Sequence, residues 1–202
     1  MSRYIATVIV SIFIFLAVFV IILIIFSRVF GLRIESPERR AGRLGERFAS
    51  SLISETLEEG DVLLTNVRIF ADGKQTELDN VIINSYGIFI IEVKNYYGEI
   101  FGDEDEHEWV KNKITPAGNI YQKSVKNPIK QVKRQIYILS SLLKENGLNV
   151  WIEGYVFFVE RNCPVDSDFV LETTDDIYNA IHTASRNRLS VDTRSKIISL
   201  LS

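Results

Sequence analysis

The feature that most constrains this chain is a long run near its N-terminus that carries no charge. No charged residue occurs from Tyr4 to Ser27, and within residues 5–26 only Thr7 and Ser11 are polar. At 1.5 Å per residue this run makes a helix of about 33 Å, which matches the thickness of a bilayer core. Both hydroxyls can bond back to the helix backbone. The run predicts one membrane-spanning helix, with residues 1–27 as an anchor.

Two other interpretations of this run are weaker. A signal peptide has a shorter apolar stretch and small residues at its cleavage site. This run is longer and ends in Phe26, Ser27 and Arg28. The second alternative, a buried core helix of a soluble protein, is less favoured still. We therefore expect an anchor that is not cleaved.

The charges that flank the run predict its orientation. Only Arg3 and the amino terminus precede it, whereas the segment that follows is rich in arginine: Arg28, Arg33, Arg39, Arg40 and Arg43. The positive-inside rule then places the N-terminus outside and the C-terminal domain in the cytoplasm. A single cysteine, Cys163, is compatible with a reducing compartment. Residues 28–36 are expected to form a juxtamembrane linker.

The remaining residues, 37–202, are enough for one domain with its own core. One cysteine excludes a disulfide framework and a multi-cysteine zinc site. The two histidines, His107 and His182, are far apart in the sequence and do not suggest a histidine-rich metal site. The net charge of −3 argues against a generic polyanion binder, so a nucleic-acid site has to be a local patch.

Hydrophobic periodicity and turn residues predict a mixed α/β domain. A helix is expected to begin at Pro37, with Ser36 as its cap. A second helix is expected over residues 128–145, and two short helices near 174–184 and 191–201. Strands are expected over residues 61–70, 76–84, 87–95, 97–101, 108–111 and 151–159. This order suggests a mixed sheet flanked by helices.

Polar residues at the end of the most apolar strand stand out. Glu92 and Lys94 are two apart, so they share one face of the strand over residues 87–95. Glu77 and Asp79 share a face of the preceding strand. A tight connection makes the two strands expected antiparallel neighbours, so that Asp79 and Glu92 can meet across the ladder.

Two carboxylates and a lysine can form a phosphodiesterase centre. The carboxylates suit a hard divalent cation such as Mg²⁺, which activates bound water, and the lysine stabilises charge on the phosphate. An alternative is a plain salt bridge at a strand end. Taken by itself, the Glu-Val-Lys triplet favours the salt bridge.

The residues around this triplet form an ordered set. Gly45 and Glu46 lie on the first helix, residues 76–79 and 87–96 contain the two acidic strands, and residues 98–100 and Trp109 follow. Residues 127–131 then open the long helix. This set resembles the nuclease-related domain, or NERD, family over roughly residues 37–160. The resemblance implies a restriction-endonuclease-like α/β fold behind the transmembrane helix.

The resemblance also implies roles for individual residues. Asp79 and Glu92 would be metal ligands for Mg²⁺ or Mn²⁺, and Lys94 the catalytic lysine. Glu46 resembles the family's helical acid and would complete the catalytic and metal site, although it can equally be a solvated helix residue. Gln131 resembles a polar helix residue that reaches the same pocket, although it can equally cap or pack.

A basic segment follows the acidic run of residues 103–106. Between Trp109 and Lys144 there is no acid, and aromatic residues are interleaved with the basic ones. This pattern suits a DNA or RNA backbone, and a solvated helix face is the alternative. The acidic run is interpreted as an exposed turn that can occupy the basic surface when no ligand is bound. The nucleic-acid-binding residues predicted here are Lys111, Lys113, Lys123, Lys126, Lys130, Lys133 and Arg134.

Two functional hypotheses remain from the sequence. The first is a membrane-anchored, metal-dependent nuclease or DNA-processing enzyme that hydrolyses phosphodiester bonds at Asp79, Glu92 and Lys94. The second is a non-enzymatic, membrane-tethered module that binds nucleic acid or protein and retains a nuclease-like fold. The intact acid–acid–lysine set favours the first, and the acidic net charge and the anchor favour the second.

Overall fold

The structure is a computed structural model that describes residues 2–29, 37–114, 118, 120–160, 162–163, 165–183 and 188–202. The chain divides into two compact units, Met1–Arg40 and Ala41–Ser202. Ser36, the predicted cap, and most of the predicted linker lie outside the described residues.

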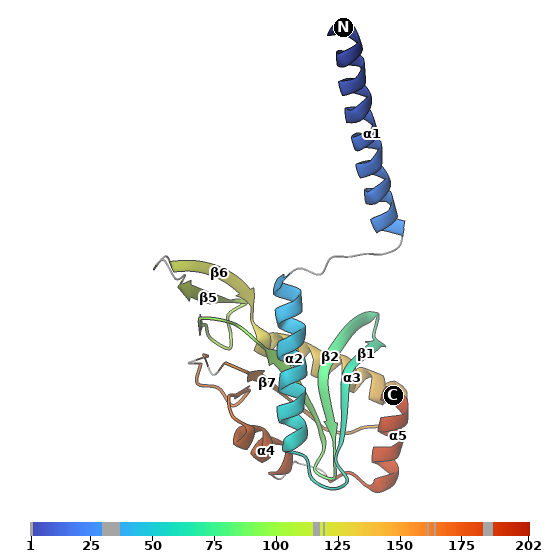
Figure 1. The fold of residues 1–202 in the computed structure, drawn as a ribbon. Coiled ribbons are helices and arrows are strands. Elements are labelled where there is room, and N and C mark those ends of the chain that lie inside the picture. The colour runs from blue at the N-terminus through green and yellow to red at the C-terminus, as the bar shows by residue number, and fades with distance from the viewer. Residues whose placement is uncertain are drawn as a thin grey trace. The chain divides into compact units, whose positions relative to one another are not determined.

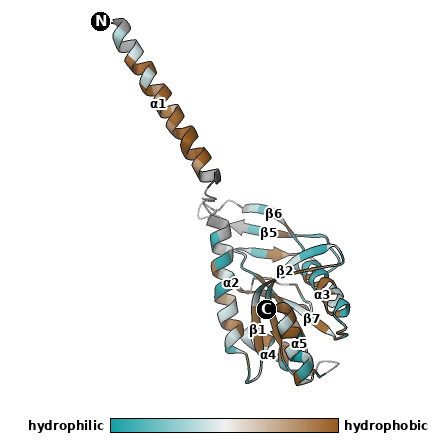
Figure 2. Cartoon of the chain, turned by 90° about the vertical axis from the view of Figure 1, so that its right-hand side faces the viewer, coloured by the Kyte–Doolittle hydropathy of each residue, from teal (hydrophilic) through white to brown (hydrophobic). Residues whose placement is uncertain are grey.

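The first helix, α1 (Ser2–Val29), contains the uncharged run. Its segment Thr7–Phe26 has a mean hydropathy of 3.6 and buries none of its length, so α1 is long and apolar enough to cross a membrane. Figure 2 shows this helix as largely hydrophobic. The Ser11 hydroxyl donates to the Thr7 carbonyl at 3.0 Å, which is the back-bonding expected of a polar side chain in an apolar helix.

A five-stranded mixed sheet forms the centre of the second unit, in the order β1-β2-β3-β7-β8 (Figure 1). The β1–β2 and β2–β3 pairs are antiparallel, and the β3–β7 and β7–β8 pairs are parallel. The predicted antiparallel pairing of the two acidic strands, β2 and β3, is confirmed. The strands are β1 (Val62–Ala71), β2 (Lys74–Ile83), β3 (Ile88–Lys94), β7 (Ile152–Phe158) and β8 (Val170–Leu171).

Helices cover both faces of this sheet, so β3 is buried on each side. On one face, α3 (Pro128–Glu145) and α5 (Val191–Leu201) pack against Val81, Ile88 and Ile90. On the other face, α2 (Pro37–Glu55) and α4 (Thr174–His182) pack against Ile82, Phe89 and Ile91. The alternation of these residues along β2 and β3 is the two-residue period of a strand that has core on both faces.

A second, three-stranded antiparallel sheet is inserted between β3 and α3. It consists of β4 (Glu99–Phe101), β5 (Glu108–Ile114) and β6 (Ile120–Lys126). Trp109 on β5 is fully buried and packs with Ile129 of α3 and Phe158 of β7. This third cluster fixes the small sheet beside the end of β3.

The predicted α/β class, a mixed sheet flanked by helices, is confirmed. The helices over residues 128–145 and 191–201 have the predicted bounds, the first helix of the domain begins at the predicted Pro37, and the remaining boundaries shift by a few residues. β6 and β8 are strands that the sequence analysis did not predict.

Candidate active site

The charged pair lies at the C-terminal end of β3. The side chain of Glu92 is 4% exposed and that of Lys94 is 14% exposed. Nζ of Lys94 donates a hydrogen bond to Oε1 of Glu92 at 2.6 Å. A buried carboxylate is costly unless it is paired, so Lys94 stabilises Glu92 in this buried position.

Two glutamines of α3 complete the contacts of Glu92. Gln131 accepts a hydrogen bond from Lys94 Nζ at 3.1 Å and donates one to Oε1 of Glu92 at 2.6 Å. Gln135 donates from Nε2 to Oε2 of Glu92 at 2.6 Å and to the carbonyl of Glu77 at 3.1 Å. The structure therefore brings the predicted Gln131 to the pair and adds Gln135.

Sequence reasoning missed Gln135, although the sequence contains a signal for it. Gln135 is fully buried, three residues after Val132 and four before Leu139, which are both core residues. A polar residue in the middle of an apolar helical stripe needs a polar partner inside the core. Glu92 is that partner.

Asp79 reaches the end of β3 because β2 is irregular at this residue. The β1–β2 pairing keeps one register but omits Asn66 and Asp79, and Asn66 has a positive φ of 55°. Leu78 and Val81 both pack into the same cluster, although residues three apart in a regular strand point to opposite faces. β2 therefore turns at Asp79.

This turn directs the Asp79 carboxylate to the neighbouring strand. The last pair between β2 and β3 is Asn80 with Ile91. Just beyond it, Oδ2 of Asp79 accepts a hydrogen bond from the backbone N–H of Val93 at 2.9 Å. The Asp79 carboxylate thus replaces a backbone carbonyl as the acceptor for Val93, the residue between Glu92 and Lys94.

Helix α2 brings Glu46 close to the same strand end. A Cβ atom at Gly45 would lie 2.5 Å from the Cβ atom of Asn95, so this close approach requires glycine. The neighbouring Glu46 is half-buried. Burial and then the charge of Glu92 raise the pKa of Glu46, so Glu46 lies within electrostatic reach of the pair.

The site accumulates negative charge. Burial, followed by the charge of Glu92, raises the pKa of Asp79 to about 7, although the Val93 N–H and Lys94 oppose this shift. Burial lowers the pKa of Lys94, but the nearby acidic groups, Glu92 first, outweigh burial and leave that pKa raised. Lys94 is therefore cationic at neutral pH, while the folded domain disfavours the ionised form of Asp79.

Carboxylate oxygens are the ligands that a hard divalent cation prefers. Each carboxylate oxygen has two lone pairs, and Oε2 of Glu92 accepts a hydrogen bond from Gln135. Oε1 of the buried Gln135 has no hydrogen-bond partner in the described part of the chain. A cation beside Asp79 and Glu92 would offset their repulsion. Within the described ranges, no three His, Cys, Asp or Glu side chains are placed to hold a metal ion, so the predicted ligand set remains a prediction.

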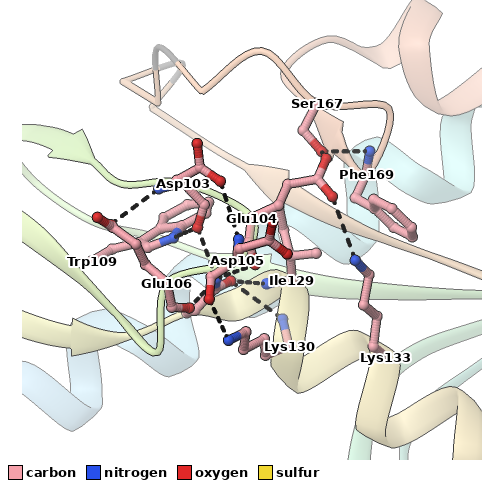
Figure 3. A network of polar contacts seen from close by, with 11 residues as sticks. Asp103, Glu104, Asp105, Glu106, Trp109, Ile129, Lys130, Lys133, Ser167 and Phe169 are labelled. Carbon is pink, nitrogen blue, oxygen red and sulfur yellow. Dashed lines mark hydrogen bonds and ion pairs between the residues drawn. The ribbon is translucent and has the colours of Figure 1, made fainter.

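The acidic turn of residues 103–106 lies against the start of α3 (Figure 3). Asn127 caps α3 by accepting from the N–H groups of Ile129 and Lys130, and its Nδ2 donates to the carbonyls of Asp103, Glu104 and Glu106. The indole N–H of Trp109 also donates to the Asp103 carbonyl, at 2.8 Å. The turn is therefore fixed to the helix through its backbone.

This turn engages two of the predicted nucleic-acid-binding lysines. Nζ of Lys130 donates to the Asp105 carbonyl at 2.6 Å, and Lys133 lies 3.4 Å from a carboxylate oxygen of Glu104. Ser167 hydrogen-bonds the other oxygen of Glu104. The neighbouring Arg134 donates to the Gln75 carbonyl at 3.4 Å. The acidic run thus contacts Lys130 and Lys133, and its occupation of a nucleic-acid surface in the absence of ligand stays a prediction.

The other predicted basic residues lie on the hairpin of β5 and β6. Lys111 and Lys123 are directly opposite in the ladder, and Lys126 is opposite Glu108. Nζ of Lys111 lies 5.0 Å from the centre of the Tyr96 ring, two residues beyond Lys94. The backbone of Lys113 belongs to β5, but its side chain lies outside the described part of the structure. This hairpin therefore brings positive charge toward the end of β3.

Comparison with known proteins finds a curated relative and a matching family. An uncharacterised protein of Bacillus anthracis is 28% identical over 107 residues, which are 52% of this chain and 47% of that protein. The chain thus spans about half the length of the curated relative it matches. No solved structure matches the chain. The family profile of the nuclease-related domain, NERD, matches residues 41–159, which include Asp79, Glu92, Lys94 and both glutamines. The chain belongs to the NERD family.

Proposed function

We propose that this protein is a membrane-anchored, metal-dependent nuclease that hydrolyses phosphodiester bonds. The observation that carries the proposal is the convergence of Asp79, Glu92, Lys94 and Gln131 at one strand end of a nuclease-related domain. The raised pKa of Asp79 adds to it: burial is its main cause and the charge of Glu92 the next, and a cation would offset the second of these.

Asp79 and Glu92 would hold Mg²⁺ or Mn²⁺, with Glu46 as a further acid at the edge of the site. When bound, the metal would polarise a phosphoryl oxygen and lower the pKa of bound water. Lys94 would stabilise the negative charge that develops on the phosphate. Gln131 contacts both Lys94 and Glu92 and so orients the pair, and Gln135 holds the second oxygen of Glu92.

The anchor and the substrate surface belong to the same proposal. Helix α1 would cross the membrane with the N-terminus outside and the domain in the cytoplasm, as the arginines after the run predict. The hairpin lysines Lys111 and Lys123 would contact a DNA or RNA backbone beside the site. Lys130 and Lys133 would join them only if the acidic turn gives up its contacts.

One observation favours the alternative, a non-enzymatic binding module. Oε1 of Glu92 is already hydrogen-bonded by both Lys94 and Gln131, which is the closed arrangement of a structural salt bridge. In that case Lys94 stabilises the fold and has no role in hydrolysis. Removing one partner of a buried pair costs about 3–5 kcal/mol.

The test is cleavage of DNA and RNA by the full chain in detergent, with Mg²⁺ or Mn²⁺. We expect metal-dependent cleavage that is lost in Asp79→Asn, Glu92→Gln and Lys94→Ala. Lys144→Ala is the matched control, because this exposed lysine lies at the far end of α3 and should leave cleavage intact.

Thermal unfolding of the same variants separates the two functions. A nuclease whose Lys94→Ala variant retains the metal-dependent rise in melting temperature supports the proposal. A wild-type chain that neither cleaves nor responds to either metal, with Lys94→Ala clearly less stable, would assign Lys94 to a structural salt bridge.

A further inference from the structure

The outer surface of α2 has no role in the site described above. The inner side of this helix packs Ala49 and Ile53 fully into the core. On the opposite side, Leu44 and Phe48 are each 55% exposed, although they are large and apolar. They are four residues apart and so lie next to each other on the helix surface.

Two exposed arginines flank this apolar pair. Arg43 precedes Leu44 and Arg47 precedes Phe48, and both arginines are exposed. Steps of three and four residues join all four side chains into one strip. We call Arg43, Leu44, Arg47 and Phe48 the α2 outer face. The half-buried Glu46 lies within electrostatic reach of Arg43 and offsets part of the positive charge at that end of the strip.

The chemistry of the strip matches the surface of an anionic bilayer. Side chains of this kind enter the boundary between headgroups and acyl chains, while arginines beside them bind the anionic headgroups. A nucleic-acid backbone would use the arginines but gives Leu44 and Phe48 no apolar partner. A second copy of α2 would cover the apolar pair but bring arginines against arginines.

Sequence distance favours the same occupant. Only seven residues separate the end of α1 at Val29 from the start of α2 at Pro37. Such a segment reaches about 25–30 Å at most, so a bilayer that holds α1 is always within reach of α2. Tethering raises the effective concentration of a weak membrane-binding surface.

We propose that the α2 outer face docks on anionic lipid at the membrane surface. The docking rests on the anchor role of α1 proposed above, and it goes beyond tethering because it fixes one side of the domain against the bilayer. The site residues of β3 and α3 take no part in the contact.

The test uses the full chain reconstituted in vesicles, with a single spin label at position 48 (Phe48→Cys). Cys163 is buried, and the wild-type chain measures any label that it takes up. Val191→Cys is the matched control, since Val191 is an apolar residue 70% exposed at the start of α5. Accessibility of each label to an aqueous paramagnetic reagent is compared between phosphatidylcholine vesicles and vesicles that also contain phosphatidylglycerol.

We expect several-fold protection of position 48 in the anionic vesicles, and no protection of position 191. Arg43→Gln with Arg47→Gln should return position 48 to the neutral-vesicle value. A label at 48 that stays accessible in anionic vesicles would overturn the docking. So would protection that rises with protein density or persists in detergent, because that result identifies a second copy. Retention of the chain after an alkaline wash tests the anchor separately, so the two failures are distinguishable.

Discussion

Asp79 combines a backbone role with a titratable one. Its carboxylate accepts the N–H of Val93, a hydrogen bond that regular strand pairing would otherwise supply, and it does so beside a second carboxylate. Unpaired backbone donors are costly in a core, so Asp79 is held in place even though its charge is disfavoured there. The free energy of unfolding should therefore depend on pH through the ionisation of Asp79.

Folding stability should fall as the pH rises through the range between the ordinary aspartate pKa and about 7. In that range the unfolded chain has lost the Asp79 proton while the folded chain retains it, because the pKa is raised to about 7. Fewer protons bound in the unfolded state make the free energy of unfolding decrease with pH. Above pH 7 the loss is complete, with an upper size on the order of a few kcal/mol.

Urea unfolding of the full chain in detergent, followed from pH 4 to 8, measures this decrease. Asp79→Asn keeps an acceptor for Val93 but cannot ionise, so its stability should vary less with pH and exceed that of the wild type above pH 7. Added Mg²⁺ should stabilise the wild type more at pH 8 than at pH 5. Equal pH profiles of wild type and Asp79→Asn would contradict the raised pKa.

Much of the candidate site could be predicted from residue patterns. The two-residue period placed Glu92 and Lys94 on one face, and the tight turn made β2 and β3 neighbours. The turn of β2 at Asp79 could not be predicted, because it depends on the omitted pair with Asn66 in the folded sheet. Gln135 was missed because burial was not assigned along the long helix, where its position in the apolar stripe is the signal.

At the scale of elements, the nucleic-acid surface proposed on the β5–β6 hairpin would lower the stability of the hairpin. Lys111 and Lys123 face each other across the ladder, and like charges in that position are destabilising. A basic pair of this kind is useful when a phosphate backbone lies over it. Stability and nucleic-acid affinity should therefore respond in opposite directions when one lysine is reversed.

Lys123→Glu should raise the free energy of unfolding by roughly 0.5 kcal/mol, because it creates an opposite-charge pair with Lys111. The same variant should weaken DNA binding and reduce its salt dependence. Urea unfolding and binding titrations at several salt concentrations measure the two effects. Lys126→Glu is the matched control, because it faces Glu108 and should lower stability by a similar amount.

The long helix and the central strands were predictable because each has one strong period and clear end signals. Asn127 and Pro128, for example, supply a side-chain cap and a residue suited to the first turn of α3. β6 has no such signal, since Gln122, Lys123 and Ser124 make it polar on both faces and only pairing with β5 orders it. β8 has two residues and exists only through pairing with β7.

At the scale of the whole molecule, the anchor should decide where the chain resides. The full chain should stay in the membrane fraction after an alkaline wash. Such a wash weakens attachment by charge, whereas an apolar helix of this length is held in the bilayer by its hydrophobic side chains. A reporter fused after Ser202 should behave as cytoplasmic. Recovery of the chain in the wash, or protease access to the reporter from outside the cell, would contradict this topology.

The parallel pairing of β3 with β7 sets the order in which a growing chain can assemble. The β1–β2 and β5–β6 hairpins and α3 form from neighbouring residues, so their contacts close short loops. β7 is synthesised only after β4, β5, β6 and α3. Glu92 and Lys94 therefore lack their β7 neighbours, Val156 and Phe158, until translation has passed Phe158.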